Sequence, residues 1–137
     1  MGTVHAEITL KNLFDEEKAG EGLIREEDIR TITVAAVVDT GAASLVINED
    51  ICKKLGLGIE RERIARVADG RRVYCKVTKP VKVLWKNRWT SCESMVIPGA
   101  ETVLLGAIAL EGMDLMVNPV ALELTGAHGD TEEYLAL

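Results

Sequence analysis

An Asp-Thr-Gly-Ala sequence at residues 39–42 constrains the fold of this chain more than any other feature. It follows residues 31–38, which are apolar enough on both sides to predict a buried strand. A carboxylate at the end of a buried strand is costly unless it is hydrogen-bonded or takes part in chemistry. Gly41 lets the backbone turn sharply two residues after Asp39. We therefore expect a strand that delivers one acid into a site, with an ordinary strand-end turn as the alternative interpretation.

The length and charge of the chain limit the classes of function that it can have. Its 137 residues suit one domain with a substantial core, so we expect residues 1–137 to form a single domain. A net charge of −6 argues against a nucleic-acid partner, because phosphate binding needs a clustered positive face. Five arginines do lie within residues 61–72, but Glu60, Glu62 and Asp69 dilute them. We interpret this cluster as a solvated hairpin face.

The cysteines and the hydropathy pattern indicate the compartment. Cys52, Cys75 and Cys92 are odd in number and form no C-x-x-C pair, and only two histidines accompany them, so we expect reduced thiols and no metal site. No signal peptide is visible, and no apolar run approaches the roughly 20 residues that a membrane span needs. We therefore expect a cytoplasmic protein without a membrane partner.

Short apolar segments between turn residues predict a mostly β fold with little helix. We expect strands at 4–10, 31–38, 64–77 (a hairpin with its turn at Asp69-Gly70), 81–85, 89–97, 102–105, 115–117 and 120–124. Two short helices are expected at 48–56, between an Asn cap and a Gly cap, and at 107–112. Residues 15–30 should form a surface connection with a helical turn at 25–29, and residues 125–137 a flexible tail. Trp85 and Trp89 flank a tight turn and predict a cross-strand packing pair.

Three motifs in a fixed order resemble the retropepsin-like aspartic proteases, single-domain relatives of pepsin that include retroviral proteases and many microbial members. The motifs are Asp39-Thr40-Gly41-Ala42, Ala68-Asp69-Gly70 in a hairpin, and Leu104-Leu105-Gly106 before a short helix. The resemblance covers about residues 4–124. It implies a closed β-barrel-like acid protease fold with one or two short helices. It also implies an aspartic endopeptidase, a hydrolase that needs no metal and no organic cofactor.

The chemistry of this family needs two carboxylates facing one water molecule. Like charges a few ångströms apart do not both ionise easily, so the pair shares a proton. The ionised partner then takes a proton from water while the protonated partner polarises the scissile carbonyl. This chain has one Asp-Thr-Gly sequence and therefore half a site. The resemblance implies a homodimer in which Asp39 of each subunit contributes to the dyad, with a peptide or protein as substrate.

The resemblance also assigns roles to the neighbours of Asp39. Thr40 would hydrogen-bond across the dimer axis, and Gly41 would let the backbone approach the catalytic oxygens. Residues 104–106 would cross behind the Asp39 loop and support it. Residues 68–70 would form the tip of a flap that closes on an extended peptide, and Ala42 belongs with them to the substrate-binding set. The segment 120–124, with alternate residues on one face, is expected to pair at the dimer interface.

The sequence departs from the retroviral pattern at several positions. Ala43 and Ala107 stand where retroviral enzymes carry an acid and an arginine, so that brace is missing, and the flap has a single glycine at its tip. Ala42 has no hydroxyl to stabilise a charged dyad, and we therefore expect a less acidic pH optimum than that of pepsin. These departures motivate a second hypothesis, in which the chain is a catalytically weak or inactive retropepsin-like module for peptide binding or dimerisation.

Overall fold

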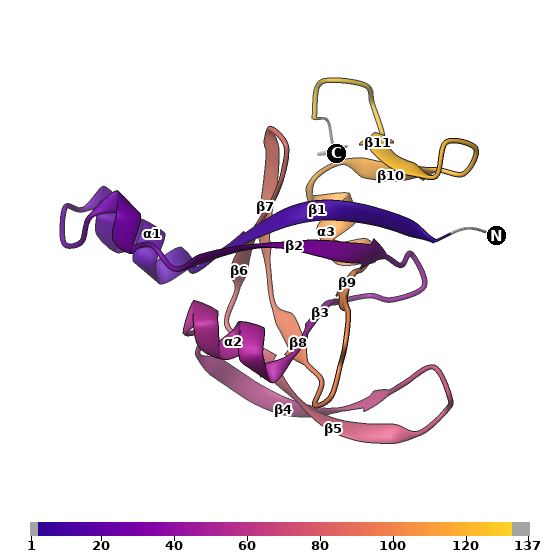
Figure 1. The fold of residues 1–137 in the computed structure, drawn as a ribbon, viewed down its shortest axis with the longest axis horizontal. Helices are drawn as coiled ribbons and strands as arrows, with labels where there is room; N and C mark the ends of the chain where they lie inside the picture. Colours follow the sequence, from indigo (N-terminus) through magenta and orange to yellow (C-terminus); the bar gives the residue numbers. More distant parts are fainter. Residues whose placement is uncertain (1–2, 133–137) are drawn as a thin grey trace, which may run out of the picture.

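The computed structural model describes residues 3–132, which are mostly β-structure with a few short helices, as predicted (Figure 1). The strands are β1 Val4–Lys11, β2 Thr31–Val38, β3 Leu45–Ile47, β4 Ile59–Arg66, β5 Arg72–Thr78, β6 Val81–Trp85, β7 Arg88–Cys92, β8 Ser94–Val96, β9 Val103–Leu105, β10 Leu115–Asn118 and β11 Glu123–Gly126. The helices are α1 Leu13–Gly20, α2 Glu49–Leu55 and α3 Ala107–Gly112, with a 3₁₀ turn, η1, at Glu26–Asp28.

Nine strands form one sheet in the order β4-β5-β8-β3-β9-β2-β1-β6-β7, and β10 pairs with β11 separately. Two of the ladders are parallel, β2 with β9 and β3 with β8, and both lie at the centre of the sheet. The order leaves β4 and β7 as edges, and within residues 3–132 no ladder joins them. Closure into a barrel is therefore not seen. Figure 1 shows β4 and β5 along one side of the molecule and the β6–β7 hairpin at the opposite side.

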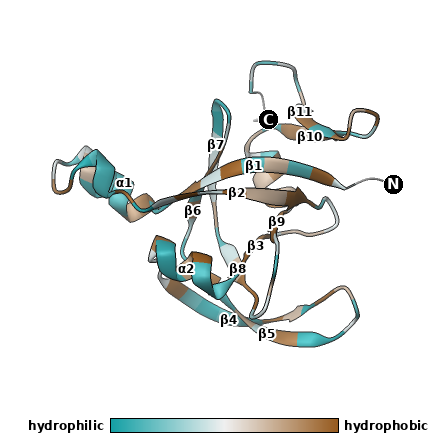
Figure 2. Cartoon of the chain, viewed as in Figure 1, coloured by the Kyte–Doolittle hydropathy of each residue, from teal (hydrophilic) through white to brown (hydrophobic). Residues whose placement is uncertain are grey.

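The core lies on one face of the central strands. Alternate residues of β1 are buried, and Ile8 and Leu10 are almost fully enclosed together with Leu45, Ile47 and Leu105. Hydrophobic residues predominate along β2, while α1 and β4 carry much of the hydrophilic surface (Figure 2). The prediction that β2 is buried on both sides is wrong. Its alternate residues from Thr31 to Ala35 are exposed, because no element within residues 3–132 covers that face of the strand there.

Local sequence signals account for α2 and for the β4–β5 turn. The Asn48 side chain accepts a hydrogen bond from the N–H of Ile51 at 2.9 Å, and Gly56 ends α2 with a φ of +61°. Gly70 has a φ of +87° in the turn between β4 and β5. Both positions need a conformation that glycine adopts without strain. The predicted helix and hairpin are therefore confirmed.

The expected surface connection at 15–30 contains a helix that the sequence analysis missed. Asn12 caps α1 by accepting a hydrogen bond from the N–H of Asp15 at 2.9 Å. The Asp15 carboxylate is buried and accepts two hydrogen bonds from the Arg30 guanidinium, at 2.8 and 3.0 Å. This pair fastens α1 to the residue before β2. The helical turn expected at 25–29 is present as η1.

The strand expected at 120–124 is wrong. Residues 119–122 form a turn in which the Asn118 side chain accepts hydrogen bonds from the N–H groups of Val120 and Ala121, both at 3.0 Å. Leu122 has a φ of +54°, and Val120 is 92% exposed. The strand begins only at Glu123, so residues 120–124 do not form the alternating face that was expected at a dimer interface.

The predicted packing between Trp85 and Trp89 is also wrong. Trp85 pairs with Arg88 across the ladder and Trp89 pairs with Leu84, which places the two indoles on opposite faces. The turn has two residues rather than three, with Lys86 at a φ of +52°. This one-residue difference in loop length changes which side chains share a face.

The segment expected to be a tail is described as far as residue 132, and residues 133–137 lie outside the described part of the chain. The buried Arg88 guanidinium donates to the carbonyl oxygens of Met113, Asp114 and Gly129. His128 Nδ1 lies 2.8 Å from a carboxylate oxygen of Asp114. These contacts join residues 128 and 129 to the segment between α3 and β10.

Candidate active site

Asp39 lies directly after β2, where the backbone leaves the sheet. Its N–H donates to the carbonyl of Leu105 at 3.0 Å, which extends the β2–β9 pairing by one step. Its Oδ1 accepts a hydrogen bond from the N–H of Gly41 at 2.9 Å. The side chain is only half-buried. One carboxylate oxygen is therefore held by the loop, while the group stays accessible from outside the chain.

The loop after Asp39 is a tight turn with little room around Gly41. The N–H of Ala42 donates to the carbonyl of Asp39 at 3.1 Å, and Thr40 at the turn is exposed. A Cβ placed on Gly41 would lie 3.3 Å from Oδ1 of Asp39. A side chain at this position would therefore crowd the carboxylate that the Gly41 N–H holds.

The segment Leu104–Gly106 packs directly behind this loop. Leu105 is fully buried, and its ladder with β2 ends beside Asp39. A Cβ on Gly106 would lie 2.5 Å from the carbonyl oxygen of Ser44 and 2.7 Å from that of Ala42. These neighbours are backbone atoms, which do not move aside as a flexible side chain can. Glycine at 106 therefore permits a backbone contact that no other residue allows.

Helix α3 adds a second support that sequence reasoning missed. The N–H of Ala107 donates to the carbonyl of Ala42 at 2.8 Å, and that of Ile108 donates to the carbonyl of Ala43 at 3.0 Å. The first N–H groups of a helix have no partner within the helix. Here two of them bind the Asp39 loop. The sequence predicted the helix after Gly106. It contained no signal that this helix binds a loop more than 60 residues earlier in the chain.

The structure thus brings 39–42 and 104–106 together, while 68–70 lie apart in the β4–β5 turn. Ala68, Asp69 and Gly70 are all exposed. The N–H of Arg71 and its guanidinium bind the Asp69 carboxylate at 2.9 and 2.6 Å, and these contacts lower the pKa of Asp69. Figure 1 shows the hairpin tip and the loop after β2 at the same end of the molecule, separated by a gap. Within residues 3–132 no hydrogen bond joins them.

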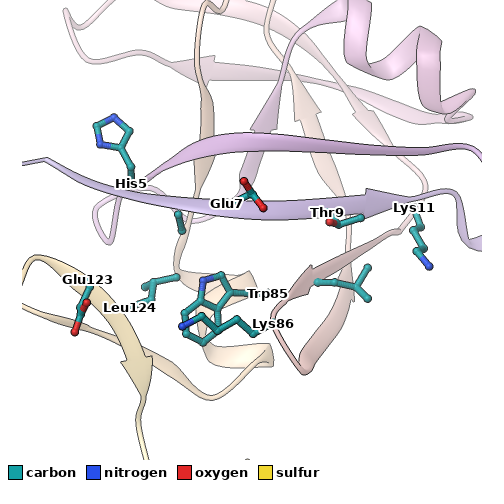
Figure 3. A pocket seen from close by; sticks show the side chains of 10 residues that line it. His5, Glu7, Thr9, Lys11, Trp85, Lys86, Glu123 and Leu124 are labelled. Carbon is teal, nitrogen blue, oxygen red and sulfur yellow. The ribbon is translucent and has the colours of Figure 1, made fainter.

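Two large cavities lie away from Asp39. One, of about 620 Å³, lies between the outer face of β1, the β6–β7 turn and β11 (Figure 3). Its polar side chains do not converge, since His5 and Glu7 point to one side of β1 and Trp85 and Lys86 lie on the other side. The other, of about 670 Å³, lies between α2 and β4.

Residues 3–132 contain no group of three or more His, Cys, Asp or Glu side chains that could hold a metal ion. The described helices include none that is long and apolar enough to cross a membrane. Burial raises the pKa of the Cys92 thiol to about 11 and raises those of Cys52 and Cys75 as well. These thiols are therefore protonated near neutral pH and are poor nucleophiles.

Comparison with models of protein families gives a match. The sequence profile of a family described as gag-polyprotein putative aspartyl protease matches residues 28–112, which is more than half of the chain. The matched range begins shortly before β2 and ends with α3, so it contains the Asp39 loop, the β4–β5 hairpin and Gly106. A search of curated proteins finds no match.

Proposed function

The chain belongs to the gag-polyprotein putative aspartyl protease family, and on that premise we propose that it is an aspartic endopeptidase that acts as a homodimer. Family membership supports a protease function and a peptide substrate. The observation that carries the finer proposal is the construction of the Asp39 loop. A half-buried carboxylate is held by the Gly41 N–H, and the loop behind it is fixed by backbone contacts to Gly106 and α3.

The homodimer follows from the number of acids at the site. The chain has a single Asp-Thr-Gly sequence, whereas water activation by a shared-proton pair needs two carboxylates. A second copy of the chain would supply the other Asp39 through a twofold axis. Asp39 is half-exposed, and the loop after β2 that carries it lies at an end of the molecule, which supports such an approach (Figure 1). Thr40 is also exposed, and we assign it to contacts across that axis.

In the proposed reaction the two Asp39 carboxyl groups hold one proton between them. The ionised group takes a proton from water, and the water oxygen bonds to the carbonyl carbon of the peptide. The other group gives its proton to the carbonyl oxygen, which forms a neutral gem-diol intermediate. As the intermediate collapses, one of its hydroxyl groups gives a proton to the ionised carboxylate, the C–N bond breaks, and the nitrogen receives the proton of the other carboxyl group. The Gly41 N–H orients the Asp39 carboxyl group by donating to Oδ1.

We assign the β4–β5 hairpin, with its tip at Ala68-Asp69-Gly70, to covering the peptide. It is suited to this because few contacts join it to the body: a short ladder, Lys76 with Val96 and Val77 with Met95, and an ion pair between Arg61 and Glu93. A hairpin held in this way can move as a unit and can exclude water from the site. Leu104, Leu105 and Gly106 act as positioning residues, because they hold the Asp39 loop without contacting the reacting atoms.

Substitution of Asp39 tests the proposal. Wild type, Asp39→Asn and a control variant, Asp50→Asn, are incubated with an unstructured protein from about pH 3 to about pH 8, and cleavage is followed by mass spectrometry. Asp50 is exposed on α2, so Asp50→Asn makes the same chemical change at a position away from the Asp39 loop. We expect cleavage by wild type and Asp50→Asn and none by Asp39→Asn.

Two outcomes would contradict the endopeptidase. Equal cleavage by wild type and Asp39→Asn would show that another group, or a contaminant, does the chemistry. Absence of cleavage by all three proteins would favour the peptide-binding or dimerisation module, which the alanines at 43 and 107 motivate. The pH of maximal cleavage then tests the role of Ala42, since a maximum below about pH 3 would contradict the expected shift from pepsin-like acidity.

A further inference from the structure

Arg88 is buried at the start of β7, next to the two-residue turn that joins β6 to β7. Its side chain is 4% exposed. Charged side chains are almost never this buried unless hydrogen bonds or ion pairs satisfy them. We infer that Arg88 is a positioning residue for Asp39, because it binds the C-terminal end of α3 while the N-terminal end of α3 binds the Asp39 loop. This inference deepens the proposed function, and the part of it that concerns cleavage rates rests on that function.

The guanidinium group of Arg88 binds backbone carbonyl groups where α3 ends. Its Nη1 donates to the carbonyl oxygen of Met113 at 3.1 Å and to that of Asp114 at 2.7 Å. Carbonyl groups at the C-terminal end of a helix have no N–H partner within that helix. Arg88 therefore fixes the end of α3 through backbone atoms, and this attachment does not depend on the side chains of α3.

Two further contacts explain how a cation is tolerated at this depth. Nη2 of Arg88 donates to the carbonyl oxygen of Gly129, and Nη1 lies 3.8 Å from Oδ2 of Asp114. The Asp114 side chain is itself 11% exposed, and His128 Nδ1 lies 2.8 Å from its Oδ1. Removal of Arg88 would take a donor from three carbonyl oxygens and a cation from a buried acid, which costs stability. Arg88 thus joins β7, the end of α3 and the segment at Gly129.

Strand β7 gives Arg88 a fixed base. It pairs with β6 along its whole length, and Val83 in the middle of β6 is fully buried. β7 also packs directly on the end of α3, since a Cβ on Gly112 would collide with the side chain of Thr90. An arginine at the start of such a strand can therefore hold α3 in one place.

The other end of α3 holds the Asp39 loop. The N–H groups of Ala107 and Ile108 donate to the carbonyl oxygens of Ala42 and Ala43, at 2.8 and 3.0 Å. The helix has six residues, is about 9 Å long and is partly buried in the core. A short, closely packed helix moves as one body, so a shift at its C-terminal end displaces the loop at its N-terminal end. Displacement of a catalytic group by about 1 Å can slow a reaction about a hundredfold.

The contacts of Asp39 itself do not involve Arg88. The Asp39 N–H donates to the carbonyl of Leu105, and Oδ1 accepts from the N–H of Gly41. Within residues 3–132 no hydrogen bond joins Arg88 to the loop at 39–43. Loss of Arg88 should therefore leave the loop attached through β9 but remove its support on the α3 side. The expected result is a folded protein in which Asp39 is displaced.

NMR spectra of the full-length chain test this prediction without any substrate. The variants are Arg88→Ala, Arg88→Lys and a control, Ile51→Ala, which removes buried side-chain volume from α2 instead. Arg88→Ala should shift the amide signals of residues 39–43 and 107–108, and the control should leave those signals close to their wild-type positions. Arg88→Lys should shift them less, because an ammonium group keeps the charge but not the forked geometry of the donors.

Chemical rescue separates a positioning role from a general loss of stability. A cavity of about 470 Å³, lined in part by Arg88, Gly126 and Gly129, gives a small cation access to the space that Arg88→Ala creates. Methylguanidinium at about 10 mM, which suits a weak complex, should return the loop signals toward wild type, and methylammonium at the same concentration should not. In cleavage assays, kcat of Arg88→Ala should fall about tenfold or more with little change in KM, and methylguanidinium should restore part of it.

Three outcomes would overturn the inference. The loop signals of Arg88→Ala could match those of wild type, the control could move them as far, or the two small cations could act equally. If Arg88→Ala does not fold, Arg88→Lys decides, and unchanged loop signals in that variant would contradict the role of Arg88. Loop signals that shift and recover as expected, in a protein that cleaves nothing, would support the positioning role and contradict the proposed function alone.

Discussion

The Asp39 loop and the β4–β5 hairpin carry the two halves of the proposed activity, but they are held by opposite means. The loop is fixed by backbone atoms, through the N–H groups of Asp39, Ala107 and Ile108 and the close contact at Gly106. The hairpin is held by its own ladder and by two residue pairs with β8. Its side chains are exposed on β4 along almost the whole strand.

The loop therefore has a fixed backbone geometry, whereas the side chains of the hairpin can vary. A backbone contact leaves no choice of side chain, so the position of Asp39 is set by the fold itself. An exposed hairpin tolerates changes of charge and size, and a segment with few buried contacts opens at low cost in free energy. In the proposed protease, the catalytic acid therefore lies on the part of the molecule held by backbone contacts, and the hairpin that covers the peptide lies on the part with fewer contacts.

The largest predicted effect on stability is at Gly106, which supports the Asp39 loop. Gly106→Ala forces a Cβ against two backbone carbonyls, so we expect a loss of about 3 kcal/mol of unfolding free energy or more. Urea denaturation measures it. Gly20→Ala is the matched control, because a Cβ there meets nothing within 4 Å, and its stability should be unchanged or slightly higher. Equal midpoints for Gly106→Ala and wild type would show that the loop is not held as described.

A second prediction compares a buried and an exposed acid, each bound to an arginine. The hydrogen bonds from Arg30 lower the pKa of the buried Asp15, and those from Arg71 lower the pKa of the exposed Asp69. A lowered pKa in the folded state means that the stabilisation is complete above the ordinary aspartate pKa, near pH 4, and is lost as pH falls through the folded value. Asp15→Asn should cost about 2 kcal/mol at neutral pH, since Arg30 is half-exposed and part of the interaction is screened.

Asp69→Asn should leave stability unchanged, because both members of its ion pair are solvated. Thermal unfolding from about pH 7 down to about pH 3 measures both variants against wild type. Asp15→Asn should lose less stability on acidification than wild type, whereas Asp69→Asn should follow the wild-type curve. If Asp69→Asn lost less stability on acidification than wild type and Asp15→Asn followed the wild-type curve, the predicted difference between the body and the hairpin would be contradicted.

The smallest predicted effect is an increase in thermal stability. Arg72→Glu places an acid opposite Arg66 and replaces repulsion with attraction, so we expect the Tm to rise by about 2 °C. The control Lys18→Glu makes the same change of charge on the exposed surface of α1 and should give no increase. An unchanged or lower Tm for Arg72→Glu would show that the two arginines do not repel each other.

The sequence predicted those parts of the fold that depend on neighbouring residues. Asn48 and Gly56 mark α2, and Asp69-Gly70 marks a turn, because caps and turns are local. The Asp-Thr-Gly sequence and Leu104-Leu105-Gly106 identified the loop and its support through their order in the chain. These signals act within a few residues or follow from a resemblance, so they could be read without knowing the tertiary structure.

The missed features depend on residues far apart in the sequence. Helix α1 has a polar sequence ending in glycine, and its stability depends on Arg30 reaching back to Asp15. Arg88 lies in the segment between Trp85 and Trp89 that was predicted to be a tight turn, but it is buried, because the carbonyl groups that it binds lie 25 to 41 residues later. Residues 120–124 alternate like a strand, but the Asn118 side chain accepts hydrogen bonds from the N–H groups of Val120 and Ala121 and forms a turn.

The central claim is that one chain holds half of a catalytic site. It is tested most directly by mixing wild type with Asp39→Asn at constant total concentration and letting the subunits exchange before cleavage is measured. A dyad shared between subunits leaves every mixed dimer inactive, so activity should fall as the square of the wild-type fraction. Activity that falls in direct proportion to that fraction would mean that each chain works alone, and it would contradict the shared site.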